Sequence, residues 1–166
     1  MKQDKFLIGI LAFIGLLVAV ALTMFFIRKD TAVYRTEDTP ENVVYNFALA
    51  IQQNDLESAY GYLADLDGKP TRAAFFQASQ NGYLNVSGNA LQVGKVTMQG
   101  PEEAWVDVTI QYLGSGPFDS GTSNHGRAVL VRQNGAWKIS SMPYPYWSGD
   151  WYLPTPAPTL VPVKQP

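Results

Sequence analysis

The stretch Glu102–Gly114, EEAWVDVTIQYLG, decides the fold because its side chains alternate between apolar and polar. A period of two residues is typical of a β-strand with one buried face. One face carries Val106, Val108, Ile110 and Tyr112, and the other carries Trp105, Asp107, Thr109 and Gln111. The aliphatic face is predicted to lie in the core, with Asp107 directed outward. If the Asp107 face lined a cavity instead, Asp107 would be a candidate acid–base group.

Three further segments are predicted strands: residues 90–100 (ALQVGKVTMQG), 127–133 (RAVLVRQ) and 136–143 (AWKISSMP). Asn134-Gly135, between the last two, is a strong signal for a tight hairpin turn. The Gly- and Ser-rich residues 114–126 are predicted to form a loop. That loop would hold the single histidine, His125, in a solvated position. The second half of the domain is therefore predicted to contain at least four antiparallel strands.

Helical signals precede the strands. Thr39 is a candidate cap, Pro40 suits a first helical position, and apolar residues then recur at helical spacing up to Ile51. Asp55 is a candidate cap for a second helix over residues 56–65, and residues 71–84 predict a third. Helices segregated from a run of strands indicate an α+β domain. Three helices packed on a curved antiparallel sheet would bury both sets of apolar faces.

An uncharged apolar run from Phe6 to Ile27 precedes this domain. As a helix it would extend about 33 Å, enough for the hydrocarbon core of a bilayer. Its length and the bulky residues at its end favour an uncleaved, single-pass signal anchor over a cleaved signal peptide. Lys2 and Lys5 nearly balance Arg28, Lys29 and Arg35, so the positive charges do not fix the orientation. The charge-poor domain is expected to lie outside the cytoplasm.

The predicted organisation has four parts. Residues 1–29 form the membrane anchor and its short N-terminal tail, 30–38 a stalk, 39–153 the α+β domain, and 154–166 a disordered Pro-rich tail. The chain has no cysteine, and its net charge of −2 comes without a basic patch. Disulfides, thiol nucleophiles and nucleic-acid binding are thereby excluded. Neither a metal site nor a cofactor site is predicted.

The order of these motifs resembles the nuclear transport factor 2-like, cystatin-like cone superfamily. The matching residues are Asp55, Ala59, Tyr60 and Leu63 in the second helix, and Gly135, Trp137, Lys138 and Ile139 in the last hairpin. The resemblance covers residues 39–142 and is closest to bacterial membrane-anchored members, most of them without assigned function. It implies a cone of helices and sheet that serves as an enzyme in some members and as a noncatalytic module in others.

The stretch Met142–Pro156, MPYPYWSGDWYLPTP, places five aromatic rings after the last predicted strand. Closure of the core is the first interpretation of these rings, a ligand or partner platform the second, and a membrane-interface belt the third. The candidate ligand-binding residues are Tyr45, Tyr60, Asp107, Trp147 and Trp151. No catalytic residue is assigned.

Two functions of different classes remain. The first is a membrane-tethered, noncatalytic module that binds a protein, a second copy of the chain or a small apolar ligand. The second is an isomerase- or dehydratase-type enzyme that uses a carboxylate or a tyrosine in the cone. The few acid–base candidates favour the first, so the chain is expected not to be an enzyme.

Overall fold

The computed structural model describes residues 5–27, 32–84, 86–112, 114, 116 and 121–153. The chain divides into two compact units, Met1–Val33 and Tyr34–Pro166. The predicted disordered tail, residues 154–166, lies outside the described residues, as do the flanking charges Lys2, Arg28 and Lys29. The described residues of the second unit form three helices and a four-stranded sheet, which is the predicted α+β architecture.

Helix α1 (Lys5–Ile27) covers the apolar run of the first unit. Its described large apolar side chains are exposed, including Phe6 at 77% and Phe13 at 62%. Within the described part of the chain, no helix combines the length and the hydropathy required to cross a membrane. The expectation of a spanning helix over Phe6–Ile27 is thus not supported by the described residues.

The three predicted helices of the second unit are present as α2 (Pro40–Gln52), α3 (Leu56–Gly61) and α4 (Arg72–Gln80). Asp55 caps α3 as predicted, because its carboxylate accepts a hydrogen bond from the Ser58 amide at 3.2 Å. Thr39 is the N-cap residue of α2 as predicted, but its side chain does not cap the helix. Its hydroxyl makes no cap hydrogen bond and is buried without a partner among the described residues. Pro40 in the first turn lacks an N–H, so one fewer donor needs a cap there.

The sheet is antiparallel and has the order β1-β2-β3-β4, with strands β1 (Asn89–Met98), β2 (Glu103–Tyr112), β3 (Thr122–Gln133) and β4 (Ala136–Ser141). Its alternation is the predicted one: Val106, Val108 and Ile110 are buried, and Asp107 is exposed. The β3–β4 turn also follows the sequence, with positive φ angles of 53° at Asn134 and 83° at Gly135.

Strand β3 begins at Thr122, five residues before the predicted start at Arg127. The prediction that residues 122–126 form a loop, with His125 in it, is therefore wrong. Pairing with β2 overrides their polar, Gly-containing sequence, and His125 lies opposite Thr109 in the ladder. Residues 122–125 are exposed and Gly126 is half-buried, so this part of the strand needs no apolar pattern.

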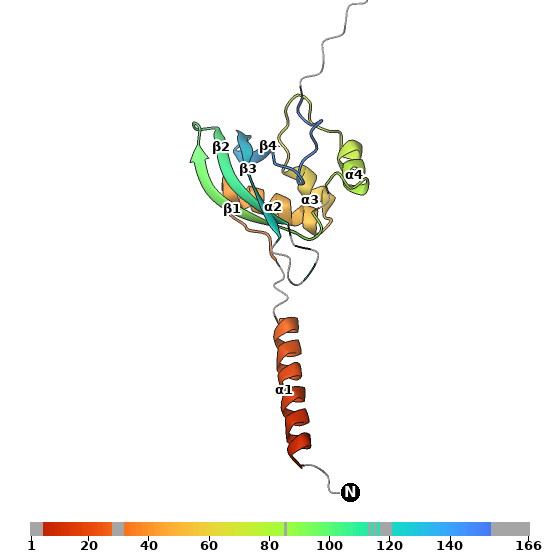
Figure 1. Ribbon diagram of the computed structural model, residues 1–166. Coiled ribbons are helices and arrows are strands. Elements are labelled where there is room, and N and C mark those ends of the chain that lie inside the picture. Colours follow the sequence, from red (N-terminus) through yellow and green to blue (C-terminus); the bar gives the residue numbers. More distant parts are fainter. Residues whose placement is uncertain are drawn as a thin grey trace, which may run out of the picture. The chain divides into compact units, whose positions relative to one another are not determined.

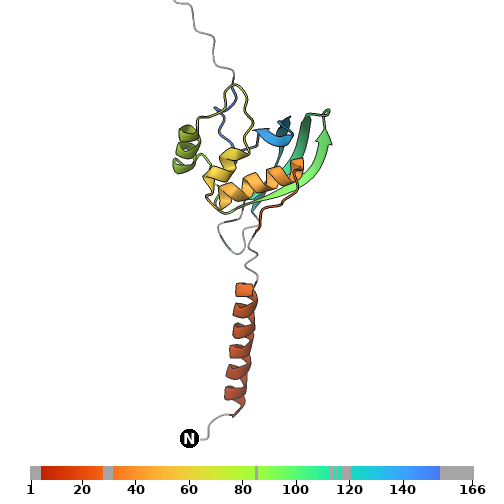
Figure 2. The ribbon, with the colours of Figure 1, turned by 180° about the vertical axis from the view of Figure 1, so that it is seen from behind.

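The sheet curves around α2, which lies along its concave side, while α3 and α4 lie beyond one end of α2 (Figures 1 and 2). Helix α2 contacts β1, β2 and β4, whereas α4 contacts α3. A short backbone pairing joins the helices to the sheet: Ile139 of β4 donates to the Tyr62 carbonyl, and Ala64 donates to the Ile139 carbonyl, both at 2.8 Å. The core between the layers is continuous.

Residues 34–38, predicted as part of a stalk, are fastened to α2 and to neighbouring elements. The buried side chain of Asn46 accepts from the Arg35 amide and donates to the Arg35 carbonyl, each at 2.8 Å. The Tyr34 hydroxyl donates to the Asp55 carboxylate at 3.0 Å, and Asp38 accepts from the Trp137 amide at 3.3 Å. The second compact unit accordingly begins at Tyr34.

Replacing Asn46 with alanine is expected to lower the free energy of unfolding by about 2–4 kcal/mol, because two backbone groups of Arg35 lose their partner in a partly buried place. Asn42→Ala is the matched control, since Asn42 lies one helical turn earlier and its bonds are exposed. Denaturant unfolding of the full chain measures both. Equal small effects would contradict a structural role for residues 34–38.

Candidate functional site

The aromatic stretch after β4 is buried, as the first interpretation of the sequence predicted. Trp147 and Trp151 are each 8% exposed, and Tyr146 is fully buried. Tyr144 differs, with 65% of its surface exposed. The segment leaves β4 over β3, where a Cβ at Gly126 would lie only 2.7 Å from Pro143. The backbone of β3 is therefore covered closely by this segment.

The two tryptophans join helices that are distant in the chain. Trp147 meets Phe47 of α2 with ring centroids 6.3 Å apart, and it meets Trp151 at 5.1 Å. Trp151 in turn packs against Phe75 of α4 at 5.2 Å, and Phe75 meets Tyr60 of α3 at 5.6 Å. Such ring pairs stabilise beyond their buried area. This set, here called the aromatic chain, links α2, α3 and α4.

Tyr152 fixes the end of the segment. Its amide donates to the Gly68 carbonyl at 2.8 Å, and its hydroxyl donates to the Ala64 carbonyl at 2.6 Å. Gly68 has a φ of 80°, and a Cβ there would lie 2.8 Å from the Tyr152 Cα, so a larger residue would displace the segment. Burial raises the pKa of the Tyr152 phenol, and nearby Tyr60 and Asp65 raise it further. The hydroxyl therefore remains a donor at neutral pH.

Local sequence sets both ends of α4, which forms the facing wall. Thr71 caps its start by accepting from the Ala74 amide at 3.2 Å. Its end is a Schellman motif: Gly82 takes a φ of 79°, and the Tyr83 amide donates back to the Ala78 carbonyl at 2.9 Å. This reversal returns Tyr83 toward the last turn of the helix, where the residue is 61% exposed.

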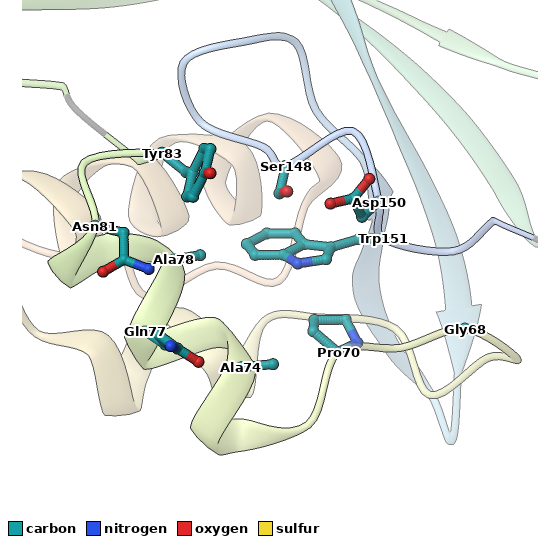
Figure 3. A pocket seen from close by; sticks show the side chains of 10 residues that line it. All are labelled: Gly68, Pro70, Ala74, Gln77, Ala78, Asn81, Tyr83, Ser148, Asp150 and Trp151. Atoms are coloured by element: carbon teal, nitrogen blue, oxygen red, sulfur yellow. The ribbon is translucent and has the colours of Figure 1, made fainter.

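Between α4 and the C-terminal segment lies an open surface pocket of about 340 Å³, here called the α4 cavity. Its described lining comes from three segments: Gly68, Pro70, Ala74, Gln77, Ala78, Asn81, Tyr83, Ser148, Asp150 and Trp151. Figure 3 shows the Trp151 indole in the middle of this group, with Ser148 and Asp150 on one side of it and Pro70 on the other. Ala74, Gln77 and Ala78 come from α4.

The α4 cavity combines an apolar floor with a polar rim. Trp151, Pro70 and the two alanines offer apolar contacts, while Gln77, Asn81 and Ser148 offer donors and acceptors. Asp150 is the single charged group among the described lining residues. A cavity of this size with a few polar groups over an apolar floor is typical of a small-ligand or side-chain binding site.

The five candidate residues from the sequence do not form one site. Tyr60, Trp147 and Trp151 meet in the aromatic chain, and Trp151 alone of the five lines the α4 cavity. The Tyr60 hydroxyl makes a hydrogen bond within the domain, donating to the Pro70 carbonyl at 3.0 Å. Tyr45 lies elsewhere, under the Arg35 guanidinium at 3.9 Å from its ring centroid.

Asp107 lies on the outer face of the sheet, in the position predicted for a strand residue outside the core. It pairs with Arg127 at 3.3 Å, and both side chains are about half exposed. Beside them, Thr109 and His125 share a hydrogen bond of 3.0 Å, and the four residues line a separate depression of about 440 Å³. In the described part of the chain, no three His, Cys, Asp or Glu residues gather in a way that could hold a metal ion.

None of the ligand-binding residues predicted from the sequence lies within residues 68–83, although this segment supplies most of the α4 cavity lining. The Thr71 cap, the Asn81-Gly82 helix end and the Ser148–Asp150 turn are all visible in the sequence as local signals. The contact of α4 with a segment about 75 residues later, however, depends on tertiary packing, which no local pattern reveals. Nothing in the sequence therefore indicated that Asp150 and Tyr83 line the same cavity.

No protein-family model matches the chain, and no curated protein matches it either. Among solved structures, the chain is similar to an NTF-2 like protein of unknown function from Shewanella oneidensis MR-1, with 9% identity and a TM-score of 0.44 over 58% of this chain and 88% of that one. It is also similar to a protein of unknown function with a cystatin-like fold from Nostoc punctiforme, with 15% identity and a TM-score of 0.46 over 63% and 90%.

A ketosteroid isomerase-like protein from Erwinia carotovora atroseptica is similar as well, with 12% identity and a TM-score of 0.41 over 60% of this chain and 86% of that one. These descriptions name the same kind of fold as the resemblance noted in the sequence. At these identities and TM-scores, they carry no argument about what this chain binds or catalyses.

Trp147→Ala is expected to lower the free energy of unfolding by about 3–5 kcal/mol, because it removes the central ring of the aromatic chain and leaves a void. Tyr144→Ala, three residues earlier in the same segment, is expected to change it by about 0.5 kcal/mol or less, since that ring is exposed. Chemical denaturation of both variants gives the comparison. Equal stability losses would contradict the aromatic chain as the link between the helices.

Proposed function

We propose that the chain is a membrane-tethered, noncatalytic binding module whose α4 cavity receives part of a ligand or partner. The single observation that carries the binding role is the α4 cavity itself, with its apolar floor and polar rim. The domain acts by holding this cavity outside the cytoplasm, at a membrane surface. The occupant is a protein partner or a small ligand with apolar surface.

Tethering is supported by the first unit. The 22 residues from Phe6 to Ile27 contain no charge, and the described large apolar side chains of α1 are exposed on all sides of the helix. A helix that is apolar all round needs an apolar environment, either the interior of a protein or a bilayer. The tether is thus inferred from the uncharged sequence of this segment and from the exposure of its apolar side chains.

A binding role fits the chemistry better than the isomerase or dehydratase alternative. Such enzymes need an acid or base within reach of a reacting atom. Here Asp107 pairs with Arg127 on the outer sheet face, and the hydroxyls of Tyr60 and Tyr152 donate to backbone carbonyls. Burial also raises the pKa of the Tyr146 phenol, against the lowering effect of its bond from Gln52. The raised pKa values of Tyr146 and Tyr152 keep these two phenols protonated at neutral pH, so they do not act as bases.

Filling the cavity tests the proposal. Ala74 is exposed and lines the α4 cavity, so Ala74→Trp is expected to block it without disturbing the buried core. Ala73→Trp is the matched control, because Ala73 is exposed on the same helix but is not part of the lining. The full chain, crosslinked in cells and extracted from the membrane fraction, is expected to retain its partner with Ala73→Trp and to lose most of it with Ala74→Trp.

Two results would contradict the proposal. Equal recovery of the crosslinked partner by both variants would show that the α4 cavity is not the binding site. Recovery of the wild-type chain outside the membrane fraction would refute the tether. Unfolding curves of both variants separate a blocked cavity from a damaged fold.

A further inference from the structure

We propose that the α4 cavity recognises a basic side chain, lysine or arginine, presented by a protein partner. This rests on the binding role proposed above and adds the chemical class of the group that the cavity takes. Three features of the lining carry it: its charge, its rings and its neutral acceptors.

Charge is the first feature. Asp150 is exposed at the rim, and none of the described lining residues is a lysine or an arginine. Asp150 also forms no ion pair with the described residues, in contrast to Asp107 and Asp65, whose partners are Arg127 and Lys69. A free carboxylate at the mouth of a cavity attracts cations and disfavours phosphate or carboxylate ligands.

The rings are the second feature. Tyr83 is 61% exposed and presents a phenol ring, and Trp151 forms the floor. Ring faces attract ammonium and guanidinium groups, and the surrounding apolar wall suits the methylene stem of a long basic side chain. The chain already uses this pairing elsewhere, with Arg127 over Trp105 at 4.5 Å and Lys69 over Tyr60 at 4.9 Å.

Neutral acceptors complete the site. The side-chain carbonyls of Gln77 and Asn81 and the hydroxyl of Ser148 can accept hydrogen bonds from an ammonium group, which has three donors and no acceptor. Lys69 does not fill this role itself, because it is directed to Tyr60 and Asp65 and is not part of the lining. About 340 Å³ holds one long side chain and its adjoining backbone, but not a folded element.

The test uses the full chain in nonionic detergent and four small probes: Nα-acetyl-lysine methylamide, its norleucine analogue without charge, the glutamate analogue, and N-acetylglucosamine as a neutral polyol. NMR shifts of the Ala74 and Ala78 methyl groups and of the Trp151 indole N–H report on the cavity. The lysine probe is expected to bind with a Kd of about 1 mM, and the norleucine analogue about tenfold more weakly.

Asp150→Asn is expected to weaken lysine binding several-fold and to reduce its salt dependence, whereas Asp67→Asn leaves both unchanged. Asp67 is exposed beside Gly68 but is not part of the lining, which makes it the matched control. The same titration on a chain ending at Leu153 removes Lys164, the one basic residue of the C-terminal tail, as a competing occupant. Selective lysine binding in either chain supports the proposal.

Three outcomes would overturn it. If the norleucine analogue binds as tightly as the lysine probe, the cavity is a general apolar site without a preference for charge. If only N-acetylglucosamine changes the NMR shifts, the cavity is a polyol site. If no probe changes the NMR shifts in either chain, the α4 cavity does not bind a basic side chain. In each case the binding role itself is judged separately, by whether Ala74→Trp loses the crosslinked partner while Ala73→Trp keeps it.

Discussion

The contact of Trp147 with Trp151 is the interaction on which the rest of the domain depends. Helix α4 contacts α3 but lies away from the sheet, so a single helix contact would leave it weakly held. The two indoles extend the core from Phe47 of α2 to Phe75 of α4. Because the same Trp151 forms the floor of the α4 cavity, the packing that stabilises the fold also builds the proposed binding site.

Backbone constraints fix the position of this contact. Tyr152 bonds to the loop at Gly68, and the positive φ of Gly68 permits the close approach of the two segments. Pro143 covers the backbone of Gly126 at the other end of the segment. Tyr146, Trp147 and Trp151, which lie between these two points, can then bury their area without a further strand or helix. The aromatic segment thus replaces an element of secondary structure in closing the core.

Local patterns predicted the fold well where periodicity or turn chemistry was strong. The alternation around Val108, the Asn134-Gly135 turn and the Asp55 cap all appear in the structure as predicted. Patterns failed where tertiary contacts decided the outcome. Pairing with β2 made a strand of residues 122–126, and the buried Thr39 hydroxyl makes no cap hydrogen bond. The burial of Trp147 and Trp151 was predicted, but the cavity was not, since it needs α4 and Asp150 together.

Amide hydrogen exchange of the full chain tests most directly whether the aromatic segment is part of the core. The Tyr152 amide of the segment is bonded to the Gly68 carbonyl, and the Ile139 amide of β4 is bonded to the Tyr62 carbonyl. Both amides are expected to exchange with the free energy of global unfolding. Fast exchange at Tyr152 with strong protection at Ile139 would contradict this, because it would show that the segment opens while the sheet remains folded.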